Sequence, residues 1–289
     1  MMSKHVSRRV DLGAVLRAPL AAMQWRLLLL WTLLLLLPTA VVSLPLWRSL
    51  SGLLDHSVHA PAWAAQFSPL MFGDTLSALR DGSGWLGGVA ILSLLLTLLL
   101  SPFLNGMLVG GGRANRTLGF CHLLQCGIVE YGRMFRLMLW SVVPYAAVAA
   151  LAGVALHMAD GVGDKAVLQS QADRASHLAL FVAGVLFVLA QAMVESGRAA
   201  FIADGNLRSA TRAFGRGFMQ LLRRPFSTLL SYVLISVVGY AVALALGVGR
   251  LHTPALGVGG LVLALLLAQL VVLVLGWVRV ARVYALAEV

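Results

Sequence analysis

The chain has 289 residues, of which 60% are hydrophobic and 11% are charged, and its mean hydropathy is +0.89. A soluble domain is about 45–50% apolar and about 25% charged, so this composition excludes an ordinary soluble protein and predicts a membrane protein. The formal net charge is +11. In a membrane protein the positions of the basic residues along the chain indicate its orientation.

Six apolar segments are long enough to cross a membrane, which takes roughly 20 mostly apolar residues. In chain order they are residues 27–44, 85–109, 137–157, 177–194, 227–248 and 255–278. We expect an all-α polytopic fold in which the six spans form three hairpins within one membrane domain, residues 1–289. Residues 1–26 form its N-terminal cytoplasmic segment. The first span is expected to remain as an anchor, since no convincing cleavage site follows it.

The basic residues are unevenly divided between the two sides of these spans. The two terminal segments, the second–third connection and the fourth–fifth connection hold 17 of the 22 lysines and arginines, and the opposite side holds 5. Lysine and arginine accumulate in cytoplasmic segments. We therefore expect a multi-pass protein of a bacterial inner membrane with both termini in the cytoplasm. On the outer side, residues 48–84 leave room for one or two short helices.

The second span contains a polar residue and a small-residue motif. Asn105 lies in the sequence "SPFLNGMLVGGGR", where Gly106 and Gly110 form a GxxxG face that allows close helix packing. The third and fifth spans share a local pattern, "SVVPYA" from Ser141 and "SVVGYA" from Ser236. This similarity fits either an internal repeat or chance likeness between apolar segments.

Glu195, at the end of the fourth span, is the most informative single residue. Gln191, Glu195 and Arg198 are spaced to share one helix face. An ionisable group in or near a span is a candidate functional residue, because its burial is costly. The alternative, which the sequence favours, is an interfacial ion pair between Glu195 and Arg198 that marks the end of the span. Asn105 is its rough counterpart in the second span.

The segment from residue 206 to 224 contains five arginines among apolar residues. At 100° per residue, Arg208, Arg212, Arg216 and Arg223 fall on one arc of about 80°, opposite a face of phenylalanine and leucine. We expect an amphipathic helix that Asp204 or Asn206 caps and Pro225 ends. Such a helix lies at the membrane interface with its arginines near anionic lipids. Docking of a partner protein is the alternative, and nucleic-acid binding is not expected. Residues 118–136 and 10–19 carry fainter versions of the pattern.

No motif predicts a specific enzyme, cofactor or metal site. The sequence contains no HExxH, Walker A or GxSxG motif. Cys121 and Cys126 are too far apart along a helix for a zinc pair. His56 and His59 have no evident third ligand.

Residues 195–226, "ESGRAAFIADGNLRSATRAFGRGFMQLLRRPF", resemble a segment of uncharacterised six-helix bacterial inner-membrane proteins. In that arrangement an acidic-x-x-Arg step ends one span, and a basic segment with Arg-Pro leads into the next. The topology is also similar to the membrane domain found with some glycerophosphodiester phosphodiesterases. No soluble phosphodiesterase domain accompanies it here, so that activity is not implied.

These observations favour a non-catalytic inner-membrane protein, a scaffold or accessory subunit with basic amphipathic helices on the cytoplasmic leaflet. The alternative is a transporter or permease component for a lipid-like or apolar molecule. The expected partners are anionic lipids of the cytoplasmic leaflet and a membrane or cytoplasmic protein. No cofactor is expected.

Overall fold

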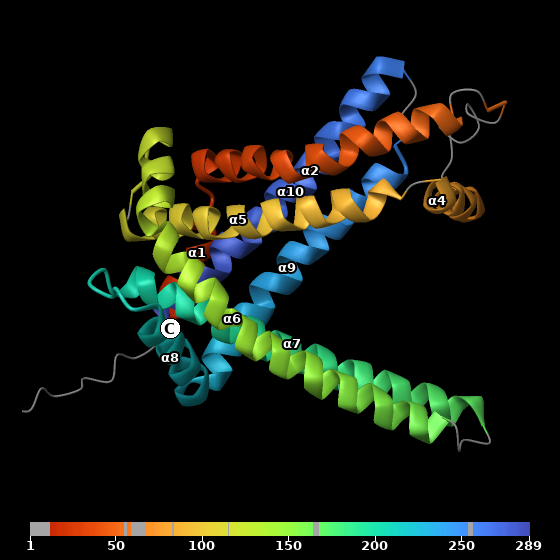
Figure 1. Cartoon of the computed structure of the whole chain (residues 1–289). Helices are drawn as coiled ribbons and strands as arrows, with labels where there is room; N and C mark the ends of the chain where they lie inside the picture. The colour runs from red at the N-terminus through yellow and green to blue at the C-terminus, as the bar shows by residue number, and fades with distance from the viewer. Residues whose placement is uncertain are drawn as a thin grey trace, which may run out of the picture.

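The chain folds into helices joined by loops (Figure 1). The computed structural model describes residues 12–54, 57–58, 68–82, 84–114, 116–163, 168–253 and 257–289, and these contain no strand. The helices are α1 (Leu12–Ala21), α2 (Trp25–Leu54), α4 (Pro69–Gly82), α5 (Trp85–Ala114), α6 (Phe120–Gly163), α7 (Gln169–Ala203), α8 (Ala210–Arg223), α9 (Pro225–Leu251) and α10 (Gly257–Glu288). The predicted all-α fold is confirmed.

Six of these helices are long and apolar enough to cross a membrane: α2, α5, α6, α7, α9 and α10. Each contains one predicted span, except that residues 255–256 at the start of the sixth lie outside the described residues. The helices extend beyond the predicted spans, most of all α6 with 44 residues and α7 with 35. The prediction of a polytopic protein with six spans is therefore confirmed.

The six long helices form three hairpins that meet at one end. α2 packs on α5, α6 on α7 and α9 on α10, while α5 also packs on α6 and α10 contacts α2 and α7. Figure 1 shows the α6–α7 hairpin running to the lower right, away from α2 and α5, which run side by side. The hairpins separate with distance from their meeting point, which we call the packed end.

The packed end holds the buried core. Met107, Leu108 and Val109 on α5 are fully enclosed there, together with Phe201 on α7 and Val280 on α10. The far halves of the long helices instead expose leucine and valine. A surface of this kind would associate in water, whereas lipid tails are as apolar as leucine. The exposure is thus what a membrane-spanning bundle requires.

Small residues let the helices approach closely at the packed end. A Cβ atom on Gly106 would lie 3.0 Å from the carbonyl oxygen of Gly127, and one on Gly110 would overlap the Cys126 side chain. The GxxxG face therefore packs α5 against α6, as predicted. Gly239 on α9 is likewise in contact with Val278 on α10.

α8 packs on α7 through glycine and alanine. A Cβ on Gly217 would lie 2.6 Å from the carbonyl oxygen of Met193 and 2.9 Å from Cα of Gly197. Ala210 and Ala213 are buried on the same face of α8. Gln220 Nε2 also donates to the carbonyl oxygen of Leu286, 2.9 Å away, which fixes α8 to the end of α10.

Three of the predicted surface elements differ in the structure. Residues 120–136 are not a separate interfacial helix but the first part of α6, because no helix breaker lies between them and the third span. α1 continues through Pro19 to Ala21, and its Ala18 is buried against the core. On the side predicted to face outward, α4 is the predicted second short helix, but the first is a continuation of α2 as far as Leu54.

Candidate functional site

Glu195 lies in the interior of the packed end. Its exposed fraction is 1%, and its Oε1 atom forms an ion pair with Arg282 Nη2 at 2.9 Å. The predicted interfacial pair with Arg198 is therefore wrong. Residues three apart on one helix share a face, but here α10 packs against α7 and brings the Arg282 guanidinium to the carboxylate.

Three hydroxyl groups of α9 surround the same guanidinium. Arg282 Nη1 donates to Tyr232 Oη at 3.1 Å, to Ser236 Oγ at 3.3 Å and to Tyr240 Oη at 3.4 Å. The Tyr232 ring also lies 4.8 Å from the guanidinium carbon. The three residues are spaced four apart, so they follow one face of the helix and form a ladder directed at Arg282.

Two further arginines lie close to this ion pair. Arg198 on α7 and Arg279 on α10 both interact electrostatically with Glu195, and Arg198 is 7% exposed. We call Glu195, Arg198, Arg279 and Arg282 the arginine–glutamate cluster. It contains three positive charges and one negative charge, which leaves a formal charge of +2.

The cluster is incompletely paired. Among the described residues, Glu195 Oε2, Arg279 Nε and Arg282 Nε are buried and have no hydrogen-bond partner. Burying a charge is costly unless it is paired. Guanidinium groups also keep their charge at physiological pH, so deprotonation cannot remove the excess. The cluster has the charge and the free donors to bind an anion.

The other two residues predicted for this site do not join it. Asn105 is buried, but its Nδ2 atom donates within α5, to the carbonyl oxygen of Ser101 at 2.8 Å. Gln191 is half-buried one turn before Glu195. Within the part of the chain that the structure describes, neither forms a hydrogen bond to Glu195.

A cavity of about 310 Å³ reaches the cluster from the membrane-spanning region. It lies between α2, α5 and α10, and Arg279 is the one charged residue of its lining. The lining also includes Trp31, Leu35, Thr97, Ser101 and Val272. The Trp31 ring lies 5.6 Å from the Arg279 guanidinium carbon, within the range of a cation–π contact.

A second group of charged residues joins α5 and α6. Arg113 Nη1 lies 2.6 Å from Glu130 Oε1, and Arg133 Nη1 lies 3.0 Å from both carboxylate oxygens. Arg113 Nε also donates to the carbonyl oxygen of Phe201 on α7. Glu130 is 5% exposed, and Arg113 joins α5 both to α6, through Glu130, and to α7, through Phe201.

The arginines predicted for the membrane interface are all exposed. α8 begins at Ala210, so Arg208 precedes it, whereas Arg212, Arg216 and Arg223 lie within it. The predicted caps are wrong: Ser209 caps the helix, since its Oγ accepts from the Arg212 amide at 3.4 Å.

Asp204 has a different role from the predicted one. Its Oδ2 atom pairs with Arg216 Nη1 at 2.7 Å, and its Oδ1 atom accepts from the Asn206 amide. The hydrogen bond from Arg216, followed by that from the Asn206 amide, lowers the pKa of Asp204 below its ordinary value of 3.8. The Asp204 carboxylate thus closes the loop between α7 and α8.

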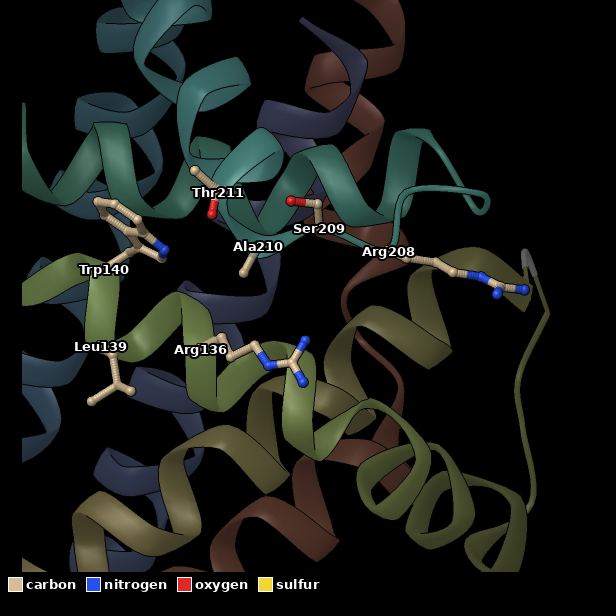
Figure 2. Close-up of a pocket in the computed structure, with 7 residues that line it drawn as sticks. All are labelled: Arg136, Leu139, Trp140, Arg208, Ser209, Ala210 and Thr211. Atoms are coloured by element: carbon tan, nitrogen blue, oxygen red, sulfur yellow. The ribbon is translucent and has the colours of Figure 1, made fainter.

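A basic pocket of about 550 Å³ opens between α6 and the start of α8 (Figure 2). The pocket is lined by Arg136, Leu139, Trp140, Arg208, Ser209, Ala210 and Thr211. Figure 2 shows the Arg136 side chain below Ser209 and Ala210, while the Arg208 side chain extends away from them. Trp140 also stacks on Phe214, with ring centroids 5.8 Å apart.

Sequence reasoning missed Glu130, Arg279, Arg282 and the hydroxyl ladder of α9, although one signal could have found the arginines. Three helices reach the packed end with the pattern Val-x-x-small-Arg: residues 109–113 in α5, 194–198 in α7 and 278–282 in α10. The second position is Gly110, Glu195 or Arg279. A threefold repeat of this kind indicates that Arg113, Arg198 and Arg282 hold corresponding places in the hairpins.

No known protein family, curated protein or solved structure matches this chain. Its function is therefore inferred from the geometry described above.

Proposed function

We propose that this chain is a non-catalytic inner-membrane protein with both termini in the cytoplasm, acting as a scaffold or accessory subunit at the cytoplasmic leaflet. The observation that carries the proposal is the surface of α8. The helix is fixed to α7 through Gly217, and its arginines and its large apolar side chains are both left exposed.

The exposed surface of α8 has two adjoining stripes. Arg212 and Arg216 form one stripe, and Phe218 and Leu222, with exposed fractions of 47% and 60%, form the other. Phe226, just beyond the helix, is 88% exposed. Apolar side chains beside arginines suit the boundary between acyl chains and anionic head groups. Each arginine there contributes about 1 kcal/mol of attraction.

The charge distribution supports the proposed orientation. The segments predicted to be cytoplasmic hold 17 of the 22 basic residues, and those of them that the structure describes lie on the side of the packed end. The resemblance of residues 195–226 to six-helix inner-membrane proteins leads to the same orientation. Cys121 offers a direct test, since it is exposed at the start of α6. In a Cys126→Ser background, an impermeant maleimide should label Cys121 in inverted vesicles and not in intact spheroplasts.

Charge reversal tests the role of α8. The triple variant Arg208→Glu, Arg212→Glu, Arg223→Glu should lose the enrichment of phosphatidylglycerol that copurifies with the protein, and it should also lose its protein partner. The matched control reverses Arg174 and Arg250, near the opposite end of the spans. If the triple variant inserts normally and keeps both its lipids and its partner, α8 does not have this role.

A second candidate function, part of a transporter or permease for a lipid-like molecule, is favoured by one observation. The cavity beside Arg279 places a charged residue of the interior cluster in one space with apolar residues of the predicted spans. Reconstitution in vesicles with a fluorescent phospholipid tests it: the wild-type chain should speed movement of the probe between leaflets, and Arg279→Gln should not. Equal rates with and without the protein would exclude this candidate.

A further inference from the structure

We propose that the cavity between α2, α5 and α10 binds an anionic amphiphile, with its acidic head group on Arg279 and its hydrocarbon chain against α2 and α10. This inference concerns binding alone. It does not depend on the role of α8, and it holds whether or not the ligand is moved across the membrane.

The charge of the site selects an anion. Glu195 is the only carboxylate in a cluster with three arginines, and its Oε1 atom is already paired with Arg282, so the charge of Arg279 is not balanced within the cluster. Arg279 Nε has no hydrogen-bond partner among the described residues, although it is buried. Arginines inside membrane spans pair with an acid or with backbone carbonyls as a rule. A phosphate or carboxylate head group on the Arg279 guanidinium would add the negative charge that the cluster lacks.

The position of Arg279 along α10 suits a head group. Arg279 directly follows residue 278, the last residue of the sixth predicted span, so it lies where the hydrocarbon region ends. Trp31 packs beside it, and tryptophan is typical of the level of lipid head groups. A guanidinium there presents planar N–H donors that match phosphate oxygens.

The rest of the cavity suits a hydrocarbon chain. Val272 lies two turns of α10 before Arg279, and Leu35 lies about one turn of α2 beyond Trp31, so both are deeper in the membrane. The two hydroxyl residues of the wall are Thr97 and Ser101, and Thr97 already donates to the carbonyl oxygen of Ser93. The volume of about 310 Å³ holds more than a phosphate ion and is at the small end of pockets for organic ligands. An apolar wall with one charged end indicates an amphiphile.

The proposal is tested with the purified full chain in phosphatidylcholine nanodiscs. Phosphatidylglycerol is added as the anionic amphiphile, and sodium phosphate serves as the free anion with the same chemistry. Binding is read from retained lipid in native mass spectrometry and from the shift in thermal midpoint. We expect the wild type to retain phosphatidylglycerol and to rise in midpoint, with no effect of phosphate. Arg279→Gln should weaken retention at least tenfold, and Arg279→Lys, which keeps the charge, less.

The stability of the protein without anionic lipid separates a binding role from a structural one. Arg279→Gln removes an unpaired positive charge from the cluster, so in phosphatidylcholine alone we expect its midpoint to equal or exceed that of the wild type. A lower midpoint there would mean that Arg279 serves packing on Trp31, which overturns the proposal. The control Arg250→Gln, at the opposite end of α9, should change neither measurement.

The second variant fills the cavity with a larger side chain. Val272→Trp leaves Arg279 in place but occupies the apolar part of the pocket, so it should abolish retention of phosphatidylglycerol. It also keeps the test decisive if Arg279→Gln fails to fold. Retention by Val272→Trp equal to that of the wild type, or binding of phosphate as tight as that of the lipid, would overturn the assignment. If the wild type itself binds no phosphatidylglycerol at this cavity but keeps normal lipid enrichment around α8, this site is refuted and the proposed scaffold role is left intact.

Discussion

Glu130 and Glu195 each lie among arginines at the packed end, but their surroundings differ. Both oxygens of Glu130 are paired, with Arg113 and Arg133, whose side chains are 22% and 26% exposed. Glu195 has one paired oxygen, and the side chain of its partner Arg282 is 9% exposed. In the first group the carboxylate has no free oxygen, and among the described residues one donor, Arg113 Nη2, is buried without a hydrogen-bond partner. In the second group, over the same described residues, one carboxylate oxygen and two guanidinium Nε atoms are buried without a partner.

The difference separates a structural ion pair from a candidate binding site. A carboxylate with both oxygens paired has little left to offer a ligand, and partly exposed arginines can be solvated on their free side. In the arginine–glutamate cluster, three guanidinium groups share the surroundings of one carboxylate, and Arg279 Nε and Arg282 Nε have no acceptor among the described residues. That deficit, more than the presence of charge, distinguishes the site.

The largest effect should come from breaking the buried pair. Glu195→Gln leaves the buried Arg198 and Arg282, and Arg279 beside them, without an acid, which should cost about 3–5 kcal/mol of unfolding free energy. SDS titration in mixed micelles measures it. The double variant Glu195→Gln, Arg282→Gln should recover part of the loss, because it removes the charge left unpaired. If Glu195→Gln lost less unfolding free energy than Glu130→Gln, the Glu130 group would be the one that depends more on its acid.

The next effect should come from Gly110, which occupies in α5 the position of Glu195 in α7. A side chain at this position would overlap Cys126, so Arg113 receives its acid from α6 instead. Gly110→Ala should cost about 1–3 kcal/mol through overpacking. Adding Cys126→Gly should relieve most of it. Gly87→Ala, with no atom near the new Cβ, is the matched control and should not destabilise the protein in the same titration.

Glu130→Gln should have a smaller effect than Glu195→Gln. The two arginines that it leaves are partly exposed and can be hydrated, so about 1–2 kcal/mol is expected. Arg133→Gln should cost less still, because Glu130 keeps Arg113. The same SDS titration measures Glu195→Gln, Glu130→Gln and Arg133→Gln on one scale. A cost equal to that of Glu195→Gln would mean that exposure does not separate the two groups.

The smallest effect should come from the exposed pair of Asp204 and Arg216. Because the folded-state pKa of Asp204 is lowered, its contribution is present above pH 3.8 and is lost as the pH falls through the lowered folded-state value. Asp204→Asn should therefore be slightly less stable than the wild type at pH 7. The two thermal midpoints should converge as the pH falls below 3.8. A difference that persists in acid would assign the effect to the loop and not to the charge.

The sequence predicted the spans well, and its predictions for the site were partly wrong. Spans follow from runs of apolar residues, a local property that Leu27 to Leu44 or Trp85 to Val109 displays directly. The partner of Glu195 is 87 positions away on α10, so it depends on which helices pack together. Arg198, the nearest candidate along the chain, was the natural but wrong choice.

The sequence-based prediction for α8 was limited in the same way, because it did not show which helix α8 packs against. Its helical wheel placed the arginines opposite a face of phenylalanine and leucine, but it did not identify the face that packs on α7. The buried face is the one with Ala210, Ala213 and Gly217, because only small side chains allow the close contact with α7. In a membrane protein, large apolar side chains can face lipid instead of another helix. The size of a side chain therefore determines helix contacts more than its hydrophobicity does.

The contact between Gly217 and Gly197 has a mechanical consequence. Backbone touches backbone there, with no flexible side chain between the helices to absorb displacement. Glu195 is two residues before Gly197, so a tilt or rotation of α7 caused by occupancy of the cluster would be transmitted to α8 as a rigid movement. A probe attached to the exposed side of α8 would then report movement of α7 near Glu195, because the two helices would move together.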